Sequence, residues 1–207
     1  MKPISKKTRR SLDKETALAR VLRVFYIYPD KEFSLSELAK ESKVAKANIG
    51  AILKNLSSFG IIKINYLTNI WRIQANTESW EFKKRKIGNN LYTIYDSSII
   101  EFLINLFKNP RAIVLIGSYR KGEDITDSDI DIAIESQEIK ETTSLGLYEF
   151  VRSKEEKKLI EEFERIIRRK IQIHLFNKDT VDSNLFKNIA NGIVLWGFLE
   201  VKAWKEK

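Results

Sequence analysis

The chain of 207 residues has no cysteine, one histidine and three prolines. Without cysteine it can form neither disulfides nor thiolate metal sites. It also lacks any apolar run near the roughly 18 residues that a membrane-spanning helix needs, so we expect no membrane partner. The sequence starts Met1-Lys2-Pro3 with no apolar segment behind it, which argues against a secretory signal. These absences together predict a cytoplasmic protein.

Acidic residues are scarce in one half of the chain only. Residues 1–91 hold 19 Lys/Arg against 8 Asp/Glu, whereas residues 92–207 hold 18 against 20. No acidic residue interrupts residues 42–77. A merely solubilising surface charge would be spread over both halves. The asymmetry therefore predicts that the N-terminal half contacts a polyanion, with DNA as the expected partner.

The N-terminal half has the periodicity of three helices followed by a hairpin. Apolar spacing predicts a helix over about 14–28, a second one starting at the capping box of Ser34 and Glu37, and a third ending near Ser58. Gly60 is typical of a helix end. Two short strands should follow, around a turn at 67–69.

This order of elements resembles the winged helix-turn-helix family, and we predict such a domain over residues 1–75. The resemblance implies that the third helix enters the major groove and that the hairpin touches the DNA backbone. The candidate DNA-binding residues are Lys43, Lys46, Asn48, Lys54, Asn69 and Arg72. Winged helices also act as dimerisation or protein-docking modules, so docking remains an alternative, and with it a homodimer.

Residues 76–96 admit two interpretations. The segments 81–86 and 91–95 could pair as a hairpin around Gly88-Asn89, or the region could be a linker. Its four consecutive cationic residues, at 83–86, would then extend the nucleic-acid surface.

The predicted second domain, residues 97–207, contains the sequence pattern with the clearest chemistry. A buried strand at 112–116 leads into Gly117-Ser118, and a polar loop connects this turn to a second strand with Asp129 and Asp131. Residues two apart in a strand share a face, so both carboxylates should project together. Such a pair needs a cation between its charges, and Mg²⁺ favours these oxygen ligands.

The Gly-Ser turn followed after ten residues by Asp-x-Asp resembles the signature of the polymerase-β nucleotidyltransferase superfamily, most closely its minimal branch, whose antitoxin members share this gap. The resemblance implies an α+β fold with a small mixed sheet. It also implies two Mg²⁺ ions at Asp129 and Asp131, and ATP or another nucleoside triphosphate as substrate. The implied nucleotide contacts are Gly117, Ser118, Arg120, Lys121 and Gly122.

The pattern departs from this family on the third strand, residues 171–175. Active members place a third carboxylate there, and alternation puts Gln172 at that position. A glutamine amide is neutral and cannot act as a base, although we retain Gln172 as a candidate catalytic residue. The substitutes considered are Asp124 and Asp127 in the loop, and His174 as a base. Glu135 shares the face of the aspartates but lies four residues beyond Asp131, which is too far along the strand.

Two functions follow. The first is an Mg²⁺-dependent nucleotidyltransferase whose acceptor, a protein, a small molecule or a nucleic-acid end, stays open. The second is a DNA-binding transcriptional regulator with a degenerate domain that senses a nucleotide. An antitoxin-like enzyme with a partner toxin is a third arrangement.

Overall fold

The computed structural model describes residues 15–67 and 70–201. The chain divides into two compact units, Met1–Phe82 and Lys83–Lys207. Within the described ranges, no helix combines the length and apolar character that crossing a bilayer requires.

In its described residues, 15–67 and 70–82, the N-terminal unit has three helices and a hairpin ahead of α5 (Trp80–Asp96). Its elements are α2 (Ala17–Ile27), α3 (Leu35–Ser42), α4 (Lys46–Ser58), β1 (Ile62–Leu67) and β2 (Ile70–Ala75). The predicted capping box at α3 is present, since the Ser34 hydroxyl accepts from the Glu37 amide and the Glu37 carboxylate accepts from the Ser34 amide. Gly60, two residues after α4, has a φ of +66°, as the sequence predicted for a helix end.

The hairpin of this unit is fastened to the segment before α3. Phe33 and Ile73 exchange two backbone hydrogen bonds, of 2.8 and 2.9 Å, and form an isolated bridge beside β2. Both side chains are fully buried, and the Phe33 ring meets the Phe25 ring edge-on at 5.9 Å. The sequence did not predict this third extended segment, which pairs with β2 through Ile73.

The C-terminal unit contains a mixed sheet of five strands in the order β5-β6-β4-β3-β7, in which β4 and β6 are parallel and the other pairs are antiparallel. This agrees with the small mixed sheet predicted for this half. Its elements are α5 (Trp80–Asp96, begun in the N-terminal unit), α6 (Ile99–Leu106), β3 (Ala112–Leu115), η1 (Tyr119–Lys121), β4 (Ile130–Glu135), β5 (Thr143–Gly146), η2 (Leu147–Phe150), α7 (Lys154–Ile167), β6 (Ile171–Phe176), α8 (Ser183–Ala190) and β7 (Ile193–Gly197).

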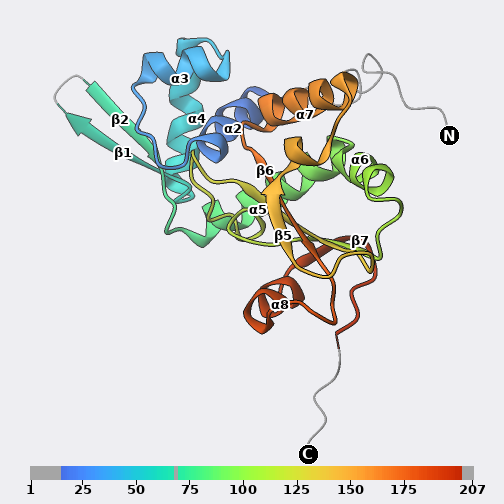
Figure 1. The fold of residues 1–207 in the computed structure, drawn as a ribbon. Helices are drawn as coiled ribbons and strands as arrows, with labels where there is room; N and C mark the ends of the chain where they lie inside the picture. The colour runs from blue at the N-terminus through green and yellow to red at the C-terminus, as the bar shows by residue number, and fades with distance from the viewer. Residues whose placement is uncertain (1–14, 68–69, 202–207) are drawn as a thin grey trace, which may run out of the picture. The chain divides into compact units, whose positions relative to one another are not determined.

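The two faces of this sheet carry different cores. Ile130, Ile132 and Ile134 point from β4 into a large cluster with apolar residues of α6 and α7. Ala133 points to the other face and belongs to a smaller cluster that includes Ile189 of α8. Figure 1 shows α8 separated from α6 and α7 by the strands. Alternation along β4 therefore assigns the Asp131 side chain to the face of the smaller core.

Residues 80–96 form the single helix α5, so both the hairpin and the linker proposed for this segment are wrong. Phe82, Lys86, Asn90 and Ile94 are all buried, at the four-residue spacing of one helix face. Because this stripe contains a lysine and an asparagine, the apolar pattern of an amphipathic helix is interrupted in the sequence. The low helix propensity of Gly88 then favours a turn at Gly88-Asn89, but tertiary packing overrides this local preference.

Glu135, the last residue of β4, is buried and has few partners that could stabilise a negative charge on its carboxyl group. Its side chain is 1% exposed, and within the described residues neither carboxylate oxygen has a hydrogen-bond partner. The nearest cation is Arg111, at 3.9 Å. Burial raises the pKa of Glu135 above its ordinary value of 4.5, against the opposing effect of Arg111 and Lys178. The folded state therefore favours the protonated form.

We predict that Glu135→Gln raises the stability of the C-terminal unit at pH 7 to 8. A raised pKa stabilises the fold fully below the unfolded value of 4.5, and this contribution is lost as the pH rises through the folded value. The amide carries no charge, so the gain should be present at pH 8, where the wild-type carboxyl is driven to ionise, and should shrink at pH 4. Chemical denaturation at pH 4 and pH 8 measures it. A variant destabilised more at pH 8 than at pH 4 would show that the carboxylate is stabilised by Arg111 instead.

Candidate active site

The Gly-Ser turn lies directly against the second aspartate. Gly117 follows β3 with a φ of +72°, and a Cβ added there would collide with Oδ2 of Asp131 and lie 3.0 Å from its Cγ. The amide of Ile116 donates to the Asp131 carbonyl at 2.9 Å. Glycine is thus needed at 117 for two reasons, the backbone angle and the carboxylate packed over it. Ser118 follows at the start of η1 and is partly exposed.

The two aspartates lie at the start of β4. Asp129 immediately precedes the strand and is exposed, whereas the Asp131 side chain is 30% exposed. The parallel register with β6 pairs Asp131 with Gln172, so the amide lies beside the carboxylate on the neighbouring strand. One step earlier, Ile130 donates to the carbonyl of Lys170 at 2.8 Å. The row of β6 residues beside the aspartates is therefore Lys170, Gln172 and His174.

His174 contacts the site more closely than its sequence position suggested. Its Nε2 lies 3.1 Å from Oδ1 of Asp131, and its Nδ1 lies 2.9 Å from the hydroxyl of Ser144 on β5. The side chains thus form a hydrogen-bonded row across three strands, from Ser144 through His174 to Asp131. The sequence predicted His174 on this face but could not predict Ser144, because β5 is short and its pairing with β6 is not encoded in an apolar pattern.

Asp124 is not available as a third carboxylate. It is 1% exposed, and its oxygens lie 2.9 Å from the Lys86 ammonium, 3.2 Å from the Arg169 guanidinium and 3.0 Å from the Asn90 amide. Lys86 also donates to the Asp124 carbonyl. All four side chains are buried. We call Lys86, Asn90, Asp124 and Arg169 the buried ionic cluster.

The buried ionic cluster corrects two predictions. Asp124 is fixed inside the domain, so it does not swing toward the aspartates, and Lys86 is fully buried, so it is not part of a nucleic-acid surface. The cluster also orders the loop after the Gly-Ser turn, because Asn90 donates to the Tyr119 carbonyl at 2.9 Å. Burial raises the pKa of the Tyr119 phenol far above its usual range, with Asp124 adding to the shift, so the phenol is no base at neutral pH.

The cationic loop residues lie in different environments. Lys121 is exposed, whereas Arg120 is half-buried, and its Nε is buried without a hydrogen-bond partner among the described residues. Gly122 has a φ of +66°, and a Cβ on it would come within 2.9 Å of the Lys83 carbonyl on α5. The structure thus gives Gly122 a packing role against α5, and its predicted contact with a nucleotide stays a prediction.

The side chains at this site supply only part of the ligands that a metal ion needs, which suits Mg²⁺. Mg²⁺ typically takes one or two carboxylates and completes its shell with water and substrate phosphates. Asp129 and Asp131 supply that number, and Gln172 offers an amide oxygen. Among the residues the structure describes, no group of three or more acidic or histidine side chains gathers at one point.

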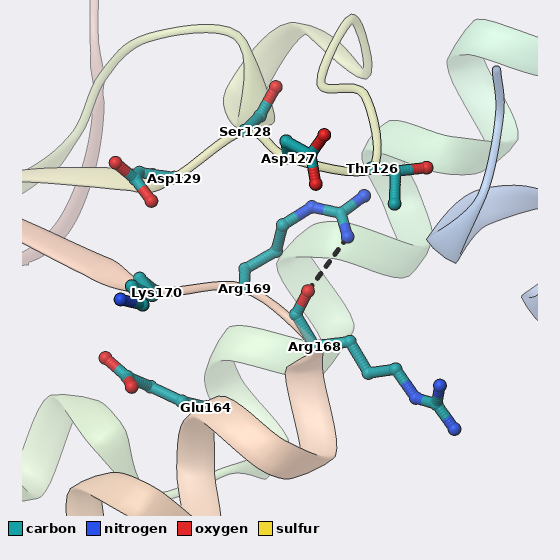
Figure 2. A pocket seen from close by; sticks show the side chains of 8 residues that line it. All are labelled: Thr126, Asp127, Ser128, Asp129, Glu164, Arg168, Arg169 and Lys170. Atoms are coloured by element: carbon teal, nitrogen blue, oxygen red, sulfur yellow. Dashed lines mark hydrogen bonds between the residues drawn. The ribbon is translucent and has the colours of Figure 1, made fainter.

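A pocket of about 380 Å³ opens at the start of β4 and β6. Its walls are residues 126–129 of the loop on one side and Glu164 with residues 168–170 on the other. Figure 2 shows Asp129 and Lys170 at one end of this space and the Arg169 side chain crossing its middle toward the loop. Sequence reasoning identified Asp129 here and missed the cationic turn, since Arg168-Arg169-Lys170 reads as an ordinary helix end.

In the N-terminal unit, the candidate DNA-binding residues that the structure describes are exposed. Lys43 precedes α4, Lys46, Asn48 and Lys54 lie on α4, and Arg72 lies on β2. Asn69 falls outside the described residues. On the hairpin, the apolar residues Leu67 and Ile70 are more than half exposed.

Residues 97–197, just under half of the chain, match the family model described as Polymerase beta, Nucleotidyltransferase. No curated protein and no solved structure matches the chain. The match supports a polymerase-β-type nucleotidyltransferase domain at these residues, and the mixed sheet with its helices fits that fold. At the level of the family, it indicates nucleotidyl transfer.

We predict that Gly117→Ala destabilises the C-terminal unit by more than about 1 kcal/mol, the cost of a left-handed angle for alanine, and displaces Asp131. His174 is the only histidine, so its ring NMR signals report this displacement without overlap. Gly88→Ala is the matched control, because a Cβ there meets nothing within 4 Å and alanine favours a helix. Unchanged stability and His174 signals in Gly117→Ala would contradict the described packing.

We predict that Asp124→Asn destabilises the same unit by about 3–5 kcal/mol, because it leaves two buried cations without their anion. The adjacent Glu123→Gln is the control. Glu123 is exposed and lies 3.7 Å from Lys83, and such a surface pair contributes at most about 1 kcal/mol. Urea unfolding of both variants gives the comparison, and equal losses would show that the buried ionic cluster is not needed for stability.

Proposed function

We propose that the C-terminal unit is an Mg²⁺-dependent nucleotidyltransferase that moves a nucleoside monophosphate from a nucleoside triphosphate, in the first instance ATP, to an acceptor hydroxyl. The observation that carries the proposal is the packing of the Asp131 carboxylate over the Gly117 turn. This packing places a carboxylate that can bind a metal ion beside a turn that can bind phosphate. The family match over residues 97–197 points to the same chemistry.

In the proposed reaction, the acceptor oxygen forms a bond to the α-phosphorus. The bond from that phosphorus to the pyrophosphate oxygen breaks, pyrophosphate leaves, and the hydroxyl proton passes to solvent. Asp129 and Asp131 would hold Mg²⁺, which when bound supplies electrostatic stabilisation of the phosphoryl oxygens. Ser118 and the exposed Lys121 contact the triphosphate.

Gln172 and His174 shape this site without supplying a third negative charge. The amide of Gln172 lies beside Asp131 in register and orients bound groups by hydrogen bonding, since it cannot accept a proton as a base. His174 holds one oxygen of Asp131 at 3.1 Å. It thereby restrains the carboxylate rotamer, which leaves the other oxygen over the Gly117 turn.

We further propose that the N-terminal unit is a winged helix that binds DNA. Support comes from the order of three helices and a hairpin, from the exposed cations on α4 and from the absence of acidic residues over 42–77. The exposed apolar side chains of Leu67 and Ile70 support protein docking as the alternative use of the hairpin.

Transfer of label from α-³²P-ATP with Mg²⁺ or Mn²⁺ tests the enzyme, with protein, RNA, DNA and small hydroxyl compounds offered separately. We expect labelling of one acceptor class by the wild type. Asp129→Asn/Asp131→Asn should lower it by at least about 100-fold, the scale of losing transition-state charge stabilisation. Glu138→Gln, an exposed residue beyond β4, is the control.

The second candidate is a regulator that binds DNA and senses a nucleotide without transferring it. Gln172 beside Asp131, in place of a carboxylate, favours it. No transfer to any acceptor, together with a rise in unfolding temperature on adding ATP, would replace the enzyme by this regulator. If the chain neither transfers label to any acceptor nor is stabilised by ATP, both the enzyme and the regulator are contradicted.

A further inference from the structure

We propose that Ser144 is a positioning residue for the nucleotidyl transfer, and that it acts through His174 on the carboxylate of Asp131. The proposal deepens the function proposed above and rests on it, because Asp131 is a residue that would hold the metal ion. The hydroxyl of Ser144 contacts the ring of His174 and not Asp131 itself. Its effect on the site therefore passes through the imidazole ring.

The backbone places Ser144 beside this ring. β5 pairs with β6 in a register that sets Ser144 directly opposite His174. Opposite residues of an antiparallel pair share a face of the sheet, so the hydroxyl can reach the ring. β5 is short, but its end is anchored, since Leu147 is fully buried and the Gly146 amide donates to the Glu149 carboxylate at 3.2 Å. Ser144 is thus held by the fold and does not depend on a ligand.

The chemistry of the end groups determines which atoms donate in this row. The carboxylate of Asp131 can only accept, so Nε2 of His174, which lies 3.1 Å from it, carries the hydrogen. In the neutral ring, Nδ1 then has a lone pair and accepts from the Ser144 hydroxyl at 2.9 Å. Ser144 therefore satisfies the ring nitrogen that Asp131 leaves without a partner.

The two hydrogen bonds together fix the orientation of the ring. The terminal torsion of a histidine is broad and roughly two-fold, so the ring can turn over by half a rotation. That rotation would put carbon atoms where Nδ1 and Nε2 now lie, and both hydrogen bonds would be lost. Without the hydroxyl of Ser144, only the contact with Asp131 opposes the rotation. Ser144 thus keeps the Nε2 edge of His174 turned toward the aspartate.

The orientation of the ring in turn determines which oxygen of Asp131 faces the Gly-Ser turn. Oδ1 accepts from His174, whereas Oδ2 lies against Gly117, where an added Cβ would collide with it. If the ring were released, the carboxylate could rotate and exchange the two oxygens. Hydrogen-bond partners that orient a metal-binding side chain typically contribute about 10- to 100-fold in metal affinity or activity. We expect Ser144 to contribute at the lower end, because it is exposed.

The first test is made on the full chain without metal or nucleotide. His174 is the only histidine, so the ¹⁵N and ¹H NMR signals of its ring are read without overlap. At pH 8.5, where a histidine ring is ordinarily neutral, we expect a protonated Nε2 whose hydrogen exchanges slowly with water. Ser144→Ala should accelerate this exchange by about tenfold, the scale of one hydrogen bond. Ser144→Thr keeps a hydroxyl and should preserve the slow exchange.

Thr143→Val is the matched control for this test. It removes the hydroxyl of the neighbouring residue on β5, which alternation places on the other face of the sheet, and it keeps the branched shape of the side chain. Its exchange rate should equal that of the wild type. An Nε2 without a hydrogen, or equal exchange rates in the wild type and Ser144→Ala, would overturn the proposal.

The second test measures the affinity for Mn²⁺ by calorimetry in the presence of α,β-methylene-ATP, an analogue that cannot transfer its nucleotidyl group. Ser144→Ala should weaken Mn²⁺ binding by about tenfold, whereas Ser144→Thr and Thr143→Val should leave it unchanged. Unchanged affinity in Ser144→Ala, or an equal loss in Thr143→Val, would reject Ser144 as a positioning residue and retain the enzyme. No Mn²⁺ binding by the wild type, with the expected NMR result, would instead reject the metal site and the proposed enzyme.

Discussion

The buried contact between Asp124 and its two cations is the interaction on which the geometry of the C-terminal unit depends. Lys86 comes from α5, Asp124 from the loop after the Gly-Ser turn, and Arg169 from the turn between α7 and β6. Three segments distant in sequence are thereby joined at one point. Charges removed from water are stable only when paired and hydrogen-bonded, so these segments cannot separate independently. The position of the loop relative to both parallel strands follows from this requirement.

Local patterns were sufficient to predict the elements whose signals are local. The capping box at Ser34, the glycine at 60 and the alternation of Ile130, Ile132 and Ile134 each result from neighbours in the sequence, and the structure confirms them. The aspartate pair was identified for the same reason, because a strand period of two places its members on one face. The contact of Asp131 with the Gly117 turn was not predictable from that period alone.

Contacts that join distant segments account for what was missed. The helix α5 was hidden because Lys86 and Asn90 occupy its buried face, and their partners lie more than 25 residues away. Lysine is so rarely buried that its presence in a sequence predicts a solvent-exposed position. Similarly, nothing near Ser144 or Lys170 indicates that strand pairing will bring them to His174 and Asp129. The sequence therefore predicted the Gly-Ser turn, the aspartates and the β6 residues of the candidate site, whereas Ser144 and Lys170 join it only through strand pairing.

The strand order has a consequence for how this unit folds during synthesis. The third strand, β3, lies between β4 and β7, and its partner β7 begins about eighty positions later in the chain. A ribosome must therefore release residues past 197 before β3 can acquire its second neighbour. Until then one side of a fully buried strand is unpaired, which is the condition under which nascent chains associate wrongly or recruit chaperones. The loop with the Gly-Ser turn is thus synthesised early and acquires its final support late.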